Sequence, residues 1–225
     1  MMKILIATTS ADSLGPGHPT GTWLEEFAVP FTAFHASGAE ITVASPRGGV
    51  TPIDPKTVPN EDQQREWMEA LAALQSTRRL NEMNAADFDA LFVPGGHGPM
   101  IDLANDPDIL RLLTAFDRAG KIIGAVCHGP AALVNAVGGD GQPLIRGRRI
   151  SGFTNNEEKL VKLDHVVPFS LEDELKRHGA HFDGTPIPFA AHVVRDGNLI
   201  TGQNPASSKA ISERMLEALS RPAAQ

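Results

Sequence analysis

Lys-Ile-Ile-Gly-Ala-Val-Cys-His-Gly-Pro-Ala-Ala, residues 121–132, joins a continuous apolar run to the only cysteine of the chain. A short apolar run that ends at a turn is typical of a strand buried on both faces, as in a parallel sheet. Pro130 suits the first turn of a helix, where its missing N–H is no loss, so we expect a helix over the small residues 131–136. The pattern therefore predicts that Cys127 stands in a sharp strand-to-helix turn, at the carboxyl end of a central strand.

This position favours a reactive thiol at Cys127. Open α/β sheets bind their ligands at the carboxyl ends of the strands. A helix N-terminus stabilises negative charge and would favour the thiolate over the thiol. An isolated cysteine is more often a small core residue. Here the adjoining His128, the flanking glycine and proline and the strand end make a nucleophile the better interpretation.

The composition is that of an ordinary globular chain, with 41% hydrophobic residues in 225. This length suits one large α/β domain or two small ones, and because we find no linker or repeat, we predict a single domain over 1–225. A lone cysteine forms no internal disulfide, and the apolar run at the N-terminus is too short for a signal peptide or a membrane span. We therefore expect a cytoplasmic protein without a membrane partner. A net charge of −7, no basic cluster and no tyrosine argue against nucleic acid as a partner.

Strand-like and helix-like segments alternate along the chain, as the repeated unit of strand, glycine-rich turn and helix requires. Besides 122–126, the expected strands are 3–8, 40–44 and 90–93. The expected helices are 23–37, 63–74, 106–119 and 208–219. Beyond residue 138 we expect β-hairpins at 144–153 and 192–201, the second with an Asp-Gly turn, and polar helices at 155–163 and 170–178. The pattern predicts a mostly parallel sheet with helices on both faces.

A glycine-rich loop, Pro-Gly-Gly-His-Gly-Pro at residues 94–99, follows the expected strand 90–93. Adjacent glycines let backbone N–H groups approach a substrate closely. The usual oxyanion hole combines such an amide with that of the residue after the nucleophile, so we expect donors at Gly95, Gly96 and His128. The alternative is that these glycines only turn the chain. His97 is expected to line the pocket or to hold a loop by hydrogen bonds.

Together these motifs resemble the ThiJ/PfpI superfamily, which is related to the class I glutamine amidotransferases. The resemblance extends over nearly the whole chain, and Ala-Val-Cys-His-Gly-Pro at 125–130 is its most specific part. Motifs at 21–26, with Pro30-Phe31, and at 94–98 also carry it. The later motifs at 152–154, 157–158 and 201–207 look like the glyoxalase III and heat-shock-chaperone branch in particular. The resemblance implies a flavodoxin-like three-layer α/β sandwich with added β-hairpins.

The same resemblance implies which side chains form a site. The nucleophile of the family falls on Cys127, and the histidine beside it falls on His128. The acid that shares a proton with the thiol falls on Glu26. Glu25 is the alternative, because two neighbouring acids blur the register and only one of two adjacent helical residues can face the thiol.

In the glyoxalase III branch a third acid orients the histidine, and it falls on Glu158, with Glu157 as the near alternative. The resemblance implies that the thiolate adds to a 2-oxoaldehyde such as methylglyoxal to give a hemithioacetal. A base, His128 or Glu26, would then move a proton from C1 to C2 through an enediol. Hydrolysis of the resulting thioester would release lactate, as in a lyase of the D-lactate dehydratase type. No glutathione, metal or other cofactor is implied; the expected partners are a small carbonyl substrate and a second copy in a homodimer.

Two other classes of function stay open. One is a different cysteine hydrolase of the superfamily, such as an amidase, peptidase or isonitrile hydratase. The other is a stress chaperone or redox sensor without turnover. His-Phe-Asp at 181–183 echoes the His-x-Glu of glutamine amidotransferases, but its acid is shorter and it lies in a polar segment, so we interpret it as surface. His178 and His181 lack a third metal ligand.

Overall fold

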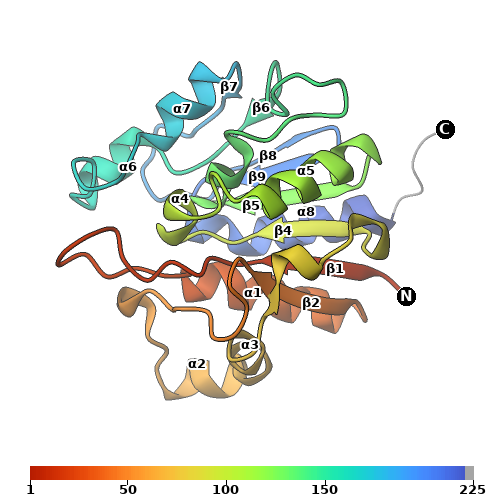
Figure 1. Cartoon of the computed structure of the whole chain (residues 1–225). Helices are drawn as coiled ribbons and strands as arrows, with labels where there is room; N and C mark the ends of the chain where they lie inside the picture. Colours follow the sequence, from red (N-terminus) through yellow and green to blue (C-terminus); the bar gives the residue numbers. More distant parts are fainter. Residues whose placement is uncertain (221–225) are drawn as a thin grey trace.

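The computed structural model describes residues 1–220, so the last five residues of the predicted domain, 221–225, lie outside it. A seven-stranded sheet runs through the middle of the molecule in the order β3-β2-β1-β4-β5-β9-β8 (Figure 1). Its strands are β1 (Lys3–Ala7), β2 (Glu40–Ser45), β3 (Arg78–Arg79), β4 (Ala90–Val93), β5 (Ile122–Val126), β8 (Val193–Asp196) and β9 (Leu199–Gly202). All neighbours are parallel except β8, which is antiparallel to β9. The prediction of a mostly parallel sheet is confirmed.

The central strands are apolar throughout because both of their faces are covered. Every residue of β4 and of β5 is buried. A strand with no solvent-facing side has no polar alternation, which is why a plain apolar run marked it in the sequence. The expected strands 90–93 and 122–126 match the structure to the residue, and the expected 3–8 and 40–44 match it to within one.

Helices cover the two faces of the sheet. The long helices α1 (Leu24–Ala36) and α8 (Ser208–Ser220) contact each other behind the sheet in the view of Figure 1, and α5 (Pro107–Arg118) lies in front. The strand order reverses between β1 and β4, so right-handed crossovers place α1 and α5 on opposite faces. The central order β2-β1-β4-β5-β9 is the flavodoxin-like one, as expected.

Two expected helices differ from the structure. The expected helix 63–74 is split into α2 (Glu61–Glu66) and α3 (Met68–Leu74), because Trp67 leaves the helical conformation while its ring packs into the core. In place of the expected helix 131–136 there is a short 3-10 helix, η4 (Gly129–Leu133), wedged against α4 (Gly98–Ile101) and α5. The other 3-10 helices are η1 (Pro55–Thr57), η2 (Leu80–Glu82), η3 (Ala85–Asp87) and η5 (Pro205–Ser207).

One of the two expected hairpins is wrong. The hairpin 192–201 is confirmed as β8 and β9. The expected hairpin 144–153 does not form, because the apolar residues 144 and 145 are buried in the core and make no strand. Instead β6 (Arg149–Ile150) pairs in parallel with β7 (His181–Phe182), a partner that is distant in sequence.

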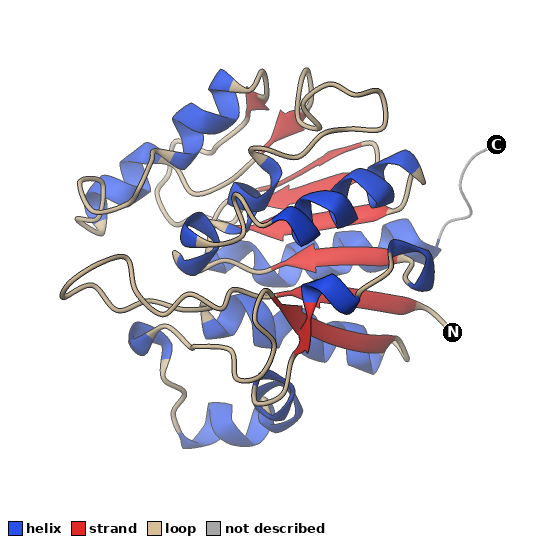
Figure 2. Ribbon diagram, in the orientation of Figure 1, coloured by secondary structure: helices blue, strands red, loops and turns tan. Residues whose placement is uncertain are grey.

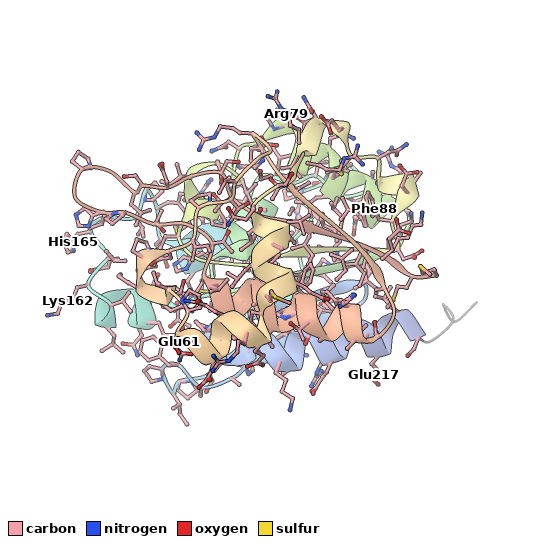
Figure 3. The ribbon with its side chains drawn as sticks, turned by 90° about the horizontal axis from the view of Figure 1, so that it is seen from below. Glu61, Arg79, Phe88, Lys162, His165 and Glu217 are labelled. Carbon is pink, nitrogen blue, oxygen red and sulfur yellow. The ribbon has the colours of Figure 1, made fainter. Side chains whose placement is uncertain are left out.

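Two short polar helices lie over the carboxyl ends of the strands, on the left in Figure 2, where long loops also gather. α6 (Asn155–Leu160) begins with a capping box between Thr154 and Glu157. α7 (Leu171–Arg177) is capped by Ser170, whose hydroxyl accepts from the amide of Asp173, the third residue of the helix. Lys162 and His165, in the turn after α6, project outward at this end of the molecule (Figure 3). Among the described helices none is long and apolar enough to span a bilayer.

Candidate active site

Cys127 follows β5 directly and has a φ of 58°, in the left-handed region that side chains other than glycine rarely adopt. Such a conformation costs roughly 1–3 kcal/mol and persists where the surroundings hold it. Here the Cys127 amide donates to the carbonyl of Gly202 at 3.0 Å, and the amide of Phe153 donates to the Cys127 carbonyl at 2.9 Å. The thiol is therefore held at a strained turn, with 4% of the residue exposed.

The loop after β4 lies against Cys127 as closely as only glycine permits. A Cβ on Gly95 would lie 2.5 Å from an oxygen of Glu26 and 2.7 Å from the Cβ of Cys127. Gly96 has a φ of 85°, and a Cβ there would lie 2.2 Å from the carbonyl oxygen of Gly21. The loop after β4 therefore packs directly against Cys127 and Glu26.

The amides of Gly96 and His128 make no backbone–backbone hydrogen bond within residues 1–220. The Gly96 amide faces the Glu26 carboxyl. The Gly96 amide also lies near the sulfur, where it lowers the pKa of the Cys127 thiol against the larger effects that raise it. The Gly96 amide comes from the loop after β4 and the His128 amide from the turn after β5, the two places where the sequence predicted oxyanion donors.

Of the two neighbouring acids on α1, only Glu26 faces the thiol. Glu25 is exposed, whereas Glu26 is completely buried. Neither carboxyl oxygen of Glu26 makes a hydrogen bond of normal length and angle within residues 1–220. Burial raises the pKa of Glu26 to about 8, although the Cys127 thiol and the Gly95 and Gly96 amides partly oppose this. Glu26 therefore carries a proton at neutral pH, which explains how a buried carboxyl tolerates this place.

Glu26 and the interior together disfavour the thiolate in the resting site. Burial raises the pKa of the Cys127 thiol well above its usual range, and the neighbouring Glu26 raises it further. The expectation that the surroundings favour the thiolate is therefore wrong for this state. The physical reason is that Cys127 lies in the protein interior and is followed by a short 3-10 helix, not by an α-helix with a large dipole.

His128 bridges the thiol and a carboxylate. Its Nδ1 lies 3.3 Å from the Cys127 sulfur, and its Nε2 lies 2.6 Å from Oε2 of Glu158. Burial and the nearby His97 lower the pKa of His128 to about 4. Burial alone would raise the pKa of Glu158, but hydrogen bonds from His128 and His97 bring it down to about 2. Because an ionised carboxylate can only accept, Nε2 of the neutral imidazole carries the hydrogen and Nδ1 offers its lone pair to the thiol.

Glu157 and Glu158 are both buried, although they are adjacent in the chain, and their carboxylates bind different partners. Glu158 faces the histidines. The Oε2 of Glu157 accepts from the amide and hydroxyl of Thr154, and its Oε1 accepts from the Phe189 amide and the Asn204 side chain, both at 2.8 Å. Glu157 thus ties the start of α6 to two other segments, and the geometry leaves Glu158 to orient His128.

His97 lies on the loop expected to supply oxyanion donors, but its side chain bonds to Glu158. Its Nε2 is 2.8 Å from Oε1 of Glu158, and its ring centroid is 4.0 Å from that of His128. Sequence reasoning placed His97 near the pocket but did not identify this partner. The only signal was the histidine directly after two glycines at a strand end.

The other histidines named from the sequence lie away from this cluster. His178 pairs with Glu174 on its own helix, and His181 is exposed. Asp183 accepts hydrogen bonds from Arg149 and His192. The segment 181–183 therefore forms its own ion pairs and supplies no group to Cys127.

Within residues 1–220, one group of side chains comes near to a metal-binding arrangement. Ligand atoms of His97, His128 and Glu158 lie within 4.8 Å of one another. Two imidazoles and a carboxylate are a donor set that zinc accepts. Here, however, each histidine already pairs with one carboxylate oxygen, at 2.6 and 2.8 Å. The Nε2 atoms of both histidines and both oxygens of Glu158 are therefore already occupied by hydrogen bonds.

Similarity to known proteins extends over nearly the whole chain. The model of the DJ-1/PfpI family matches residues 20–218. Glyoxalase 3 of Candida albicans is 30% identical, over 97% of this chain and 98% of the relative. A glutathione-independent glyoxalase of Saccharomyces cerevisiae is 29% identical, over 96% and 98%. The crystal structure of glyoxalase III from Candida albicans superposes with a TM-score of 0.89 at 28% identity, covering 96% of this chain and 97% of that one.

Proposed function

The chain belongs to the DJ-1/PfpI family, and from this premise we propose that it is a glutathione-independent glyoxalase that converts small 2-oxoaldehydes into 2-hydroxy acids. Two relatives that align over nearly their whole length support this: one is named glyoxalase 3 and the other a glutathione-independent glyoxalase. The observation that carries the proposal is the contact series from Cys127 through His128 to Glu158, beside the protonated Glu26.

In the first step, the sulfur of Cys127 bonds to the aldehyde carbon C1. His128 Nδ1, 3.3 Å away, takes the thiol proton as the bond forms, so no free thiolate is needed beforehand. The electron pair of the C1=O1 bond moves to O1, where the amides of Gly96 and His128 stabilise the charge. Proton return to O1 gives the hemithioacetal.

In the second step, a proton moves from C1 to C2 through an enediol. His128 is neutral at physiological pH and can act as the base, because its pKa is about 4. Glu26 carries a proton below about pH 8, so it suits a donor to the ketone oxygen O2, and it regains a proton from the O1 hydroxyl as the thioester carbonyl forms. Of the two bases that the sequence left open, the proposal thus takes His128 as the base and Glu26 as a proton donor.

In the third step, water attacks the thioester carbonyl, and the sulfur leaves and regains its proton. The product is a 2-hydroxy acid, lactate when the substrate is methylglyoxal. Cys127 takes the place that glutathione holds in thiol-dependent isomerisation of these aldehydes, so the proposal includes no added thiol.

Product analysis tests the proposed function. Purified protein is incubated with methylglyoxal, glyoxal and phenylglyoxal without glutathione, and the 2-hydroxy acids are quantified by chiral chromatography. We expect turnover that Cys127→Ala abolishes. A Cys127→Ala protein that retains the wild-type rate contradicts the proposal. Hydrolysis of amides in place of aldehyde loss would favour the hydrolase class.

The proposal includes a homodimer, as the family resemblance implied, and a cytoplasmic location, as the lone cysteine and the short N-terminal apolar run indicated. Light scattering after size-exclusion chromatography measures the mass in solution.

A chaperone without turnover is the competing outcome. It would be supported if Cys127→Ala still suppressed the aggregation of a test client while wild-type protein consumed no 2-oxoaldehyde.

A further inference from the structure

The two oxygens of the Glu158 carboxylate are held by two different histidines. Oε2 accepts from His128 at 2.6 Å, and Oε1 accepts from His97 at 2.8 Å. All three residues are at most 7% exposed. A carboxylate held at both oxygens cannot rotate without breaking a hydrogen bond in the interior, where the loss is costly. His97 therefore sets the plane of the group that orients His128.

His97 also lies against the face of His128. The two ring centroids are 4.0 Å apart, and the ring of Phe153 lies 4.6 Å from that of His128. A histidine so close disfavours a second positive charge on His128 and adds to the effect of burial on its pKa. His97 thus adds to the effects that keep Glu158 charged and His128 uncharged.

The backbone fixes where His97 stands. The preceding Gly96 has a left-handed φ, and a Cβ on the following Gly98 would lie 2.5 Å from the side chain of Thr9. Thr9 in turn donates to Asp102, just after α4, at 2.8 Å. The loop is therefore clamped on both sides of His97.

The outer edge of His97 borders a small cavity. This cavity, of about 120 Å³, is also lined by His18, Asp54, Lys56 and Leu163. Nδ1 of His97 has no hydrogen-bond partner among the described residues, yet it is not fully enclosed. Leu163 lies between Lys162 and His165, which project outward at this end of the molecule (Figure 3). His97 thus separates the buried carboxylate from the cavity.

We propose that His97 is a positioning residue of the reaction: it holds the Glu158 carboxylate charged and in plane, so that His128 presents an unprotonated Nδ1 to Cys127. This inference rests on the proposed function. His97 exchanges no proton in it. The S–H proton passes from Cys127 to His128 as before, and Glu158 keeps its charge throughout.

The charged and titratable neighbours define what should change without His97. His97 faces Glu158 and His128 directly, and His18, Asp54 and Lys56 across the cavity. The charges of His97, Glu158 and Glu157 in turn shift the pKa of His128. Removing His97 takes a donor from Glu158 and a repulsive neighbour from His128, and both changes make the pair take up a proton at higher pH.

The test compares His97→Leu, which keeps bulk but no donor, with His97→Gln, whose amide can still donate to Glu158. For His97→Leu we expect kcat to fall about tenfold or more while KM changes little, and the acid limb of the pH profile to move upward. His97→Gln should recover most of kcat. His18→Leu, which alters the same cavity without touching Glu158, should keep the wild-type profile. A pH-independent loss that Gln does not rescue would contradict the proposal.

A second measurement does not depend on turnover. Nitrogen-15 NMR of labelled histidines reports which ring nitrogen of His128 carries the hydrogen and at what pH the ring titrates. We expect one tautomer, with Nε2–H, in the wild type and a mixture with a higher pKa in His97→Leu. An unchanged His128 signal in a folded His97→Leu protein would overturn the inference. If the wild-type protein turned over no 2-oxoaldehyde, the proposed function would fail while this measurement still decided the role of His97.

Discussion

The Nδ1 atom of His128 lies 3.3 Å from the sulfur of Cys127, although the two residues are neighbours in the chain. In extended backbone, consecutive side chains point to opposite sides. Here the left-handed φ of Cys127 turns the chain so that both side chains meet. The strain at this turn is thus what places a base beside the thiol.

Replacing Cys127 should abolish turnover without unfolding the protein. Cys127→Ala removes the only thiol of the chain, and we expect 2-oxoaldehyde loss to fall by at least about a thousandfold. Steady-state assays measure the loss, and circular dichroism checks the fold. His192→Ala, at the Asp183 ion pair, is the matched control and should keep the wild-type rate.

Glu26→Gln and Glu25→Gln form a second pair of variants. Glu26→Gln should lower kcat strongly because the buried carboxyl beside the thiol is lost, whereas the exposed Glu25 should be replaceable with little effect. Equal small effects in both variants would contradict the assignment of Glu26.

Stability should also report on Glu26. Its pKa rises from 4.5 to about 8 in the folded protein, so the folded state holds the proton more tightly than the unfolded state. The stabilisation is complete below the ordinary value of 4.5 and is lost as the pH rises through about 8. Denaturant unfolding at several pH values should therefore show a steeper loss toward alkaline pH in the wild type than in Glu26→Gln.

Activity should follow a bell-shaped pH profile. His128 must be neutral, and its pKa of about 4 puts the acid limb well below the 6.5 of an ordinary histidine. Glu26 must carry its proton, and its pKa of about 8 sets the alkaline limb. The pH dependence of kcat/KM measures both limbs. An acid limb near 6.5 would contradict a neutral, buried His128.

Glu157 and Glu158 should separate stability from catalysis. Gln at 157 offers one acceptor oxygen where the carboxylate uses two, so we expect Glu157→Gln to lose about 2–4 kcal/mol of unfolding free energy. Its kcat per folded site should stay within about twofold of wild type. Glu158→Gln should instead lower kcat, because His128 loses its anionic partner. Urea unfolding and steady-state kinetics distinguish the two.

Removal of divalent ions should leave turnover unchanged. His97, His128 and Glu158 satisfy one another by hydrogen bonds, and no step of the proposed reaction needs a cation. Assays before and after dialysis against EDTA test this. Inactivation that added Zn²⁺ reverses would show that the group binds a metal in the active enzyme.

Predictions from the sequence were correct where the burial of a short segment determines its structure. The strands 90–93 and 122–126 were predictable because strands covered on both faces are apolar throughout. The prediction of a hairpin over 144–153 was wrong because β6 pairs with residues 181–182, and no local sequence pattern encodes a pairing over that distance. The prediction of one helix over 63–74 was wrong at Trp67, because the packing of its ring into the core interrupts an otherwise helical segment.

The sequence by itself determined the parallel sheet, the turn at Cys127 and, through the family motifs, the residue types of the site. Only the tertiary structure chose between adjacent candidates: Glu26 over Glu25, and Glu158 over Glu157. It alone paired His97 with Glu158, 61 positions apart, and shifted the pKa values of the buried groups. The physical reason is that burial and hydrogen-bond partners come from segments far apart in the chain, whereas strand and turn preferences are carried by neighbouring residues.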